Sequence, residues 1–123
     1  MNVVVWVVQV VLALFFAAAG LVKLSRRKEE LRQRMAWVDD FSQGTVRLIG
    51  AAEVLGALGL VLPAATGVAT WLTPTAALGL VVVMLGAIAT HLRRREPQVL
   101  PVNVVLLLLA AFVAWQRFGP HPL

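Results

Sequence analysis

The chain has 123 residues, of which 60% are hydrophobic, and it contains no cysteine. Soluble domains are only about 45–50% apolar, so this composition predicts a single membrane domain over residues 1–123. The lack of cysteine excludes disulfides, thiolate metal sites, iron–sulfur clusters and thiol redox chemistry carried by this chain. The net charge of +5 comes from basic residues that flank apolar segments, which argues against a nucleic-acid-binding protein.

Four apolar segments of membrane-spanning length follow one another along the chain. At ~1.5 Å rise per residue, about 20 helical residues cross the ~30 Å hydrocarbon layer. The segments cover residues 3–22, 45–62, 74–92 and 101–117. No Lys or Arg precedes the first segment, so we interpret it as a retained span and not as a signal peptide. The sequence therefore predicts an all-α protein, a polytopic transmembrane four-helix bundle.

A polar connector, residues 23–44, separates the first two spans. Leu31, Met35 and Val38 recur in it at helical spacing, with Arg and Glu on the other face. This pattern predicts a short amphipathic interfacial helix with Trp37 at headgroup level. Its functional interpretation is the binding of anionic lipid or a partner, and the alternative is a solvated connector.

The second span carries many small residues on its surface. Gly50, Gly56 and Gly59 lie among alanines, and the first span ends in the small-residue stretch AAAGLVKL. Small residues let neighbouring helix backbones approach closely in a membrane. We therefore expect helix–helix contacts to centre on these three glycines.

The charge distribution predicts the topology. Ten of the eleven basic residues lie in or beside the first and third loops. They are Lys23, Arg26, Arg27, Lys28, Arg32, Arg34, Arg47, Arg93, Arg94 and Arg95. The positive-inside rule places both loops in the cytoplasm and both termini outside, which puts Trp6, Trp71 and Trp115 at the outer interface. In this topology the loop residues that would dock lipid or a soluble partner are Arg26, Arg27, Arg93, Arg94 and Arg95.

Glu53 lies in the middle of the second span, where a charge costs about 2.5–3.5 kcal/mol on insertion scales. Arg47 is six residues away on the same helix, a spacing that does not bring two side chains together, so the partner of Glu53 should come from another helix. Lys23, Arg47, His91 and Asn103 all lie near the cytoplasmic ends of their spans, and Glu53 lies ~9 Å deeper than Arg47. We therefore expect a polar vestibule that opens to the cytoplasm, with Glu53 at its floor.

Each of these candidate ligand or proton-site residues also has a plainer interpretation. Lys23 and Arg47 could simply extend to the headgroups, and His91 could be an interfacial residue without a partner. Asn103 could bridge helices, and Glu53 could serve as a structural pin for the bundle. The same residues predict no metal site, because one Glu, one His and one Asn without a thiol do not form a convincing ligand set. No nucleophile–base pair, nucleotide-binding loop or haem-ligand pair is visible, which weighs against an enzyme.

Three stretches resemble a known family: FAAAGLVKL in the first span, IGAAEVLGALGLVLP in the second and TPTAALGLVVVMLGAIATHLRRRE in the third. They hold a G-x-x-K pattern, a mid-helix Glu among glycines, and a terminal His followed by basic residues and Glu. On these motifs nearly the whole chain resembles the DoxX-like family of small four-span bacterial membrane proteins. The resemblance implies polar family positions at Lys23, Glu53 and His91, and further candidates at Arg47, Glu96 and Asn103.

The resemblance also implies a setting in the bacterial inner membrane. The family is named for a subunit associated with a quinone-linked thiosulfate oxidoreductase. Other members are linked with membrane oxidoreductase complexes that include superoxide dismutase and a sulfurtransferase in oxidative-stress defence. Because this chain has no cysteine, it is not expected to handle sulfane sulfur or thiols covalently.

Three functional hypotheses remain open. The first is a non-catalytic anchor, or a partner- or small-ligand-binding subunit, that supports a membrane redox or oxidative-stress complex and meets lipid or soluble redox proteins on its cytoplasmic side. The second is a quinone-interacting subunit of an oxidoreductase, with Glu53 and His91 exchanging protons with bound quinone. The third is a small proton-coupled transporter, a homo-oligomer, with Glu53 as the coupling site.

Overall fold

The computed structural model describes residues 1–32 and 35–123, so Arg34, one of the basic residues counted above, lies outside the described residues. Four long helices make up the fold: α1 (Asn2–Ser25), α3 (Gln43–Thr66), α4 (Leu72–Arg93) and α5 (Leu100–Phe118). Each is long and apolar enough to cross a membrane. The predicted all-α four-helix bundle is confirmed.

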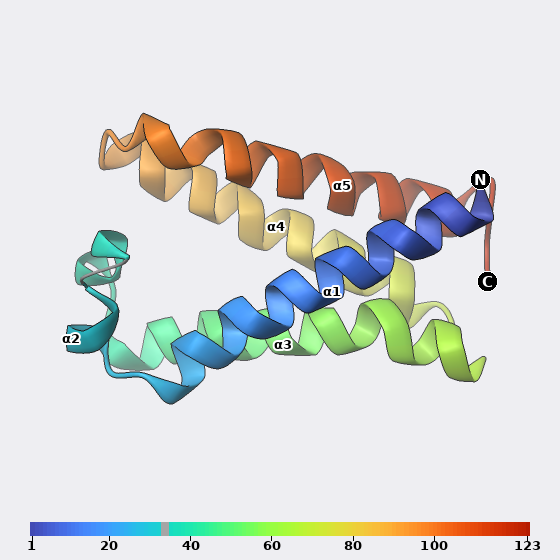
Figure 1. The fold of residues 1–123 in the computed structure, drawn as a ribbon, viewed down its shortest axis with the longest axis horizontal. Coiled ribbons are helices and arrows are strands. Elements are labelled where there is room, and N and C mark those ends of the chain that lie inside the picture. Colours follow the sequence, from blue (N-terminus) through green and yellow to red (C-terminus); the bar gives the residue numbers. More distant parts are fainter. Residues whose placement is uncertain (33–34) are drawn as a thin grey trace.

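The four helices are arranged as two pairs (Figure 1). Helix α1 packs most extensively against α3, and α4 packs against α5. The pairs meet at the end that holds both chain termini and diverge toward the end that holds the first connector. Buried apolar side chains from all four helices, such as Phe16, Leu60, Leu80 and Val113, form the core where the pairs meet.

Outward-facing side chains are also apolar. Leu14, Leu48, Leu55 and Leu108 are among many large hydrophobic residues that are more than half exposed. A water-soluble bundle places polar residues on this outer face, whereas hydrocarbon chains solvate apolar side chains well. The exposed apolar surface is therefore what a bundle embedded in lipid requires.

Helix α3 extends further than the predicted span, which ended at Leu62. It runs through Pro63 to Thr66 and stops at Gly67, whose left-handed conformation (φ +73°) caps the helix. The carbonyl of Pro63 accepts the Gly67 N–H at 2.9 Å. Pro63 lies inside the last turn of α3 and has no N–H to donate to the carbonyl of Gly59, so the helix lacks one backbone hydrogen bond there.

The connector differs from the single amphipathic helix predicted there. Its described helical parts are α2 (Lys28–Leu31) and a 3-10 helix, η1 (Ala36–Asp40). Leu31 and Val38 are buried together with Val46 of α3. The apolar face recognised in the sequence is therefore buried against the protein's own helix, and two short helical elements present it.

Close helix approach depends on glycine, as expected. A Cβ atom on Gly50 would lie 2.8 Å from the carbonyl oxygen of Gly20, and one on Gly20 would lie 2.5 Å from the carbonyl oxygen of Gly50. Backbone atoms cannot move aside as a side chain can, so only glycine fits where α1 crosses α3. On the α4 side, Cβ atoms on Gly56 and Gly59 would each lie 2.7 Å from the nearest side-chain atom, of Leu80 and Ala76 respectively.

We predict that Gly50→Ala destabilises the bundle, because overpacking a tight contact costs about 1–3 kcal/mol. Gly79→Ala on α4 is the matched control, since a Cβ atom there would meet nothing within 4 Å. In a helix that control should be neutral or stabilising by up to ~1 kcal/mol. Thermal unfolding of both variants in detergent measures the difference, and equal melting temperatures would show that the crossing tolerates a side chain.

Candidate functional site

The partner of Glu53 is Lys23, which comes from another helix as expected. Lys23 Nζ on α1 lies 2.6 Å from Glu53 Oε1 on α3, and both side chains are almost completely buried. A second contact holds the lysine, because Nζ lies 5.8 Å from the centre of the Trp37 ring, within cation–π range. Two opposite charges thus enter the apolar bundle as a pair.

The glycine crossing positions this ion pair. Lys23 is three residues after Gly20, and Glu53 is three residues after Gly50, so each lies within one turn of the crossing glycine of its own helix. A Cβ atom on Gly50 would also lie 2.8 Å from Cβ of Lys23. The stem of Lys23 therefore passes over Gly50, which leaves room for the ammonium group to reach Glu53.

A cavity of about 540 Å³ lies against this pair. All four long helices contribute to its wall, as do the connector residues Met35, Trp37 and Phe41. Most of the wall is apolar, with Phe15 from α1 and Met84 from α4 as its larger side chains. The volume of this cavity and its largely apolar lining are typical of small-molecule sites in proteins.

Two polar groups at the cavity have no partner among the described residues. Lys23 binds Oε1 of Glu53, while Oε2 receives no hydrogen bond from that part of the chain. Asn103 from α5 lines the same cavity, and its Nδ2 is buried without an acceptor among the residues described. Buried polar groups are nearly always hydrogen-bonded, so the buried Asn103 amide is a candidate for contact with a bound molecule. Glu53 Oε2 is a second candidate, because it carries no hydrogen bond from the described residues.

The end of α4 holds His91 against Glu96. Arg95 adopts a left-handed conformation (φ 56°), and the chain turns back so that the N–H of Glu96 donates to the carbonyl of His91 at 2.9 Å. This is the Schellman arrangement, formed here without glycine. It brings Glu96 Oε1 to 3.1 Å from His91 Nδ1 and 3.2 Å from Arg94 Nε.

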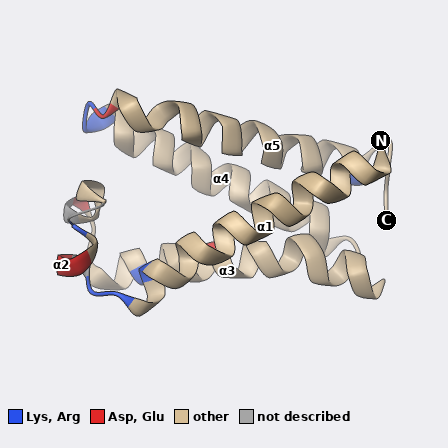
Figure 2. Ribbon diagram, viewed as in Figure 1, with Lys and Arg blue, Asp and Glu red and all other residues tan. Residues whose placement is uncertain are grey.

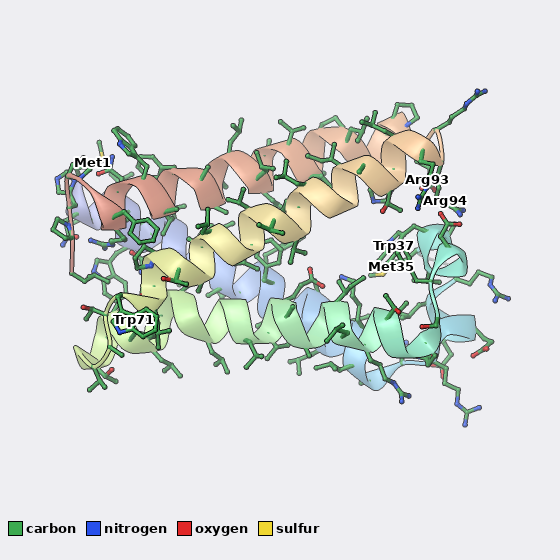
Figure 3. The ribbon with its side chains drawn as sticks, turned by 180° about the vertical axis from the view of Figure 1, so that it is seen from behind. Met1, Met35, Trp37, Trp71, Arg93 and Arg94 are labelled. Atoms are coloured by element: carbon green, nitrogen blue, oxygen red, sulfur yellow. The ribbon has the colours of Figure 1, made fainter. Side chains whose placement is uncertain are left out.

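An ion pair joins this turn to the connector. Arg94 Nη1 donates to Asp40 Oδ1 at 2.8 Å, which ties η1 to the end of α4. Desolvation opposes the charge on Arg94, but Asp40 and Glu96 outweigh it and raise the pKa of Arg94 above its ordinary value. Figure 3 shows Trp37 and Met35 between the two helix pairs, close to Arg93 and Arg94. The connector thus forms the wall of the cavity at its loop end.

Charged residues gather at this same end of the molecule, while the long helices are nearly free of them (Figure 2). Arg26, Arg27, Arg93 and Arg95, four of the five predicted docking residues, are exposed there. The fifth, Arg94, is largely occupied by Asp40 and Glu96.

A second polar network lies at the opposite end. Arg117 is 3% exposed, and its Nε donates to Gln9 Oε1 at 2.7 Å, while Gln9 Nε2 donates to the carbonyl of Leu60 at 2.7 Å. Arg117 Nη1 also donates to Asn2 Oδ1, and the guanidinium lies 5.8 Å from the Trp6 ring. These contacts join the end of α5 to the start of α1, while Nη2 of Arg117 is buried without an acceptor among the described residues.

Most of the cavity's polar residues were predicted from the sequence. Lys23, Glu53, His91 and Asn103 all line the cavity, whereas Arg47 is exposed on α3 and does not line it. The wall formed by Met35, Trp37 and Phe41 was not predicted, although the apolar spacing of the connector is visible in the sequence. The Arg117 network was not predicted either, although a lone Gln in one span and a lone Arg at the end of another signal it. No group of three potential metal ligands occurs in the described part of the chain.

A family model for the DoxX-like family matches residues 7–113, most of the chain. The chain belongs to the DoxX-like family. The matched region contains the ion pair and the whole cavity wall, whereas Arg117 lies beyond it. Comparison with curated proteins and with solved structures returned no match. Family membership and four apolar helices together make this DoxX-like chain a multi-pass membrane protein.

We predict that Glu53→Gln and Lys23→Met each destabilise the protein strongly, because each leaves one buried charge without its partner. Breaking a buried pair in this way costs about 3–5 kcal/mol. The double variant Lys23→Met/Glu53→Gln removes both charges and should be more stable than either single variant. Thermal unfolding of all four proteins in detergent measures the coupling, and strictly additive losses would show that the pair contributes nothing as a pair.

Proposed function

We propose that this DoxX-like protein is a non-catalytic membrane subunit that binds a small amphiphilic molecule in the cavity between its helices. The observation that carries the proposal is the cavity itself, an apolar space with the Lys23–Glu53 pair and the unpaired Asn103 amide on its wall. Such a site holds an apolar body and fixes the orientation of a polar head. No arrangement of nucleophile, base and electrophile accompanies it among the described residues, which favours binding over catalysis.

The proposed orientation follows from the charges. With the basic loops in the cytoplasm of a bacterial cell, the loop end of the cavity meets the cytoplasmic headgroup layer and both termini lie outside. The exposed Arg26, Arg27, Arg93 and Arg95 would then contact anionic lipid or a soluble redox partner. In this role the protein would anchor or support a membrane redox or oxidative-stress complex.

A second candidate function is that of a quinone-interacting subunit of an oxidoreductase. The observation in its favour is that Glu53 and His91, two side chains able to exchange protons, line the same cavity. The transporter hypothesis has less support, because it requires a free carboxylate as the coupling site. Glu53 Oε1 is instead paired with Lys23 Nζ at 2.6 Å.

We predict that a small molecule remains bound after purification in mild detergent, and that mass spectrometry of the extracted protein identifies it. The matched sample is Ala87→Leu, which adds a large side chain to the cavity wall and should release the molecule. A retained quinone favours the second function, and any other amphiphile favours the first. Equal recovery from both proteins would place the molecule outside the cavity.

We further predict that removing the exposed arginines weakens partner capture. In native membranes, a pull-down with Arg26→Gln/Arg27→Gln/Arg93→Gln/Arg95→Gln should recover several-fold less soluble partner than the wild type, and the loss should be imitated by high salt. Arg47→Gln, on the exposed side of α3, is the control. If the wild type itself captures no soluble protein, the role in a complex is refuted while ligand binding stands.

A further inference from the structure

We infer that the head of the bound amphiphile is uncharged and both donates and accepts hydrogen bonds, as a hydroxyl or a primary amide does. This inference rests on the proposed function, which requires only that some small amphiphile binds in the cavity. The observations that carry it are the internal neutrality of the Lys23–Glu53 pair and the two polar groups left without partners beside it.

Charge balance at the cavity wall disfavours an ionic head. Lys23 and Glu53 neutralise each other, so an anionic head would have to draw Lys23 away and leave Glu53 buried alone. A cationic head would have to draw Glu53 away and leave Lys23 buried without a partner. Leaving one member of a buried pair unpaired is strongly unfavourable, so an ion gains little from this wall.

The charges at the loop end do not change this balance. Arg94 is held by Asp40 and Glu96, at 2.8 Å and 3.2 Å. Arg93 also lines the cavity, but its side chain is 68% exposed, and its Nη2 lies 3.8 Å from Asp40 Oδ2. An exposed cation attracts an anion weakly, because water and salt screen it.

The unpaired groups specify what the head must offer. Oε2 of Glu53 is an acceptor and needs a donor, whereas Nδ2 of Asn103 is a donor and needs an acceptor. Two other polar atoms on the wall are already engaged: Thr90 Oγ1 donates to the Gly86 carbonyl at 2.9 Å, and His91 Nδ1 lies 3.1 Å from Glu96 Oε1. A hydroxyl or a primary amide can meet either requirement, since each both donates and accepts hydrogen bonds.

The rest of the cavity specifies an apolar body. Phe15, Met84 and Leu106 supply wall from three helices, and Trp37 and Phe41 supply it at the loop end. Apart from the polar groups named above, this wall offers dispersion contacts and no directional bonds. Shape and chain length are therefore less restricted than the chemistry of the head.

The test compares three probes that share one alkyl chain and differ only in the head: decanol, decyl sulfate and decyltrimethylammonium. Each is tritiated and equilibrated with the full chain in phosphatidylcholine nanodiscs, and empty discs give the partition background. Decanol should bind at least tenfold more tightly than either ion. If either ion binds as tightly as decanol, the inference is overturned and the proposed function stands. If no probe binds above background, both fail.

The variant Asn103→Leu tests the role assigned to the amide. It keeps the size of the side chain and removes the hydrogen-bonding group, so decanol affinity should fall about tenfold, the effect of one hydrogen bond. Melting of the ligand-free variant should occur at the same or a higher temperature, because the amide Nδ2 has no acceptor in the described chain. Asn103→Gln restores an amide and should recover part of the affinity.

Two outcomes would overturn this assignment. One is unchanged decanol binding in Asn103→Leu. The other is a lower ligand-free melting temperature or loss of folded protein, which would make Asn103 a structural bridge and not a ligand contact. Arg47→Gln, exposed on α3 away from the cavity, is the control and should leave both affinity and melting temperature unchanged.

Discussion

A carboxylate in the middle of a membrane-spanning helix must be paired inside the protein, and the rest of this structure depends on how that is achieved. Lipid offers Glu53 no hydrogen bond and no counter-charge, so the partner has to reach it through the bundle. Lys23 does so because α1 and α3 cross where each helix has a glycine. The ion pair, the glycine crossing and the small-residue surface of α3 are thus one structural feature.

The polar groups at the two ends of the bundle have different surroundings. At the end that holds the termini, Arg117 is buried among Gln9, Asn2 and the Trp6 ring, and this network joins α5 to α1. At the loop end the helix pairs diverge, and a cavity remains. On its wall are the buried Asn103 amide, which has no acceptor, and Glu53 Oε2, which receives no hydrogen bond from the described residues. Arg117 makes its hydrogen bonds within the protein through Nε and Nη1, although Nη2 has no acceptor among the described residues, so this network mainly joins helices. The unpaired groups at the cavity are where a ligand gains most from binding.

The connector belongs to the site as much as the helices do. Its apolar residues Leu31 and Val38 hold it against α3, and Asp40 ties it to Arg94 at the end of α4. Trp37 is thereby placed over the ammonium group of Lys23 and forms the loop end of the cavity. A segment with the pattern of a surface helix therefore becomes part of the wall.

The sequence by itself determined the number and approximate positions of the spans, because the thickness of a bilayer and the absence of water within it permit few alternatives to four apolar helices. It also determined that Glu53 needed a partner from another helix and that glycines would mark the helix contacts. Only the tertiary structure decided that the partner is Lys23, because interhelical distances depend on crossing angles that no single helix encodes. It likewise decided that Arg47 faces away: six residues at about 100° each turn it some 120° from Glu53, and only packing reveals which of the two faces is enclosed.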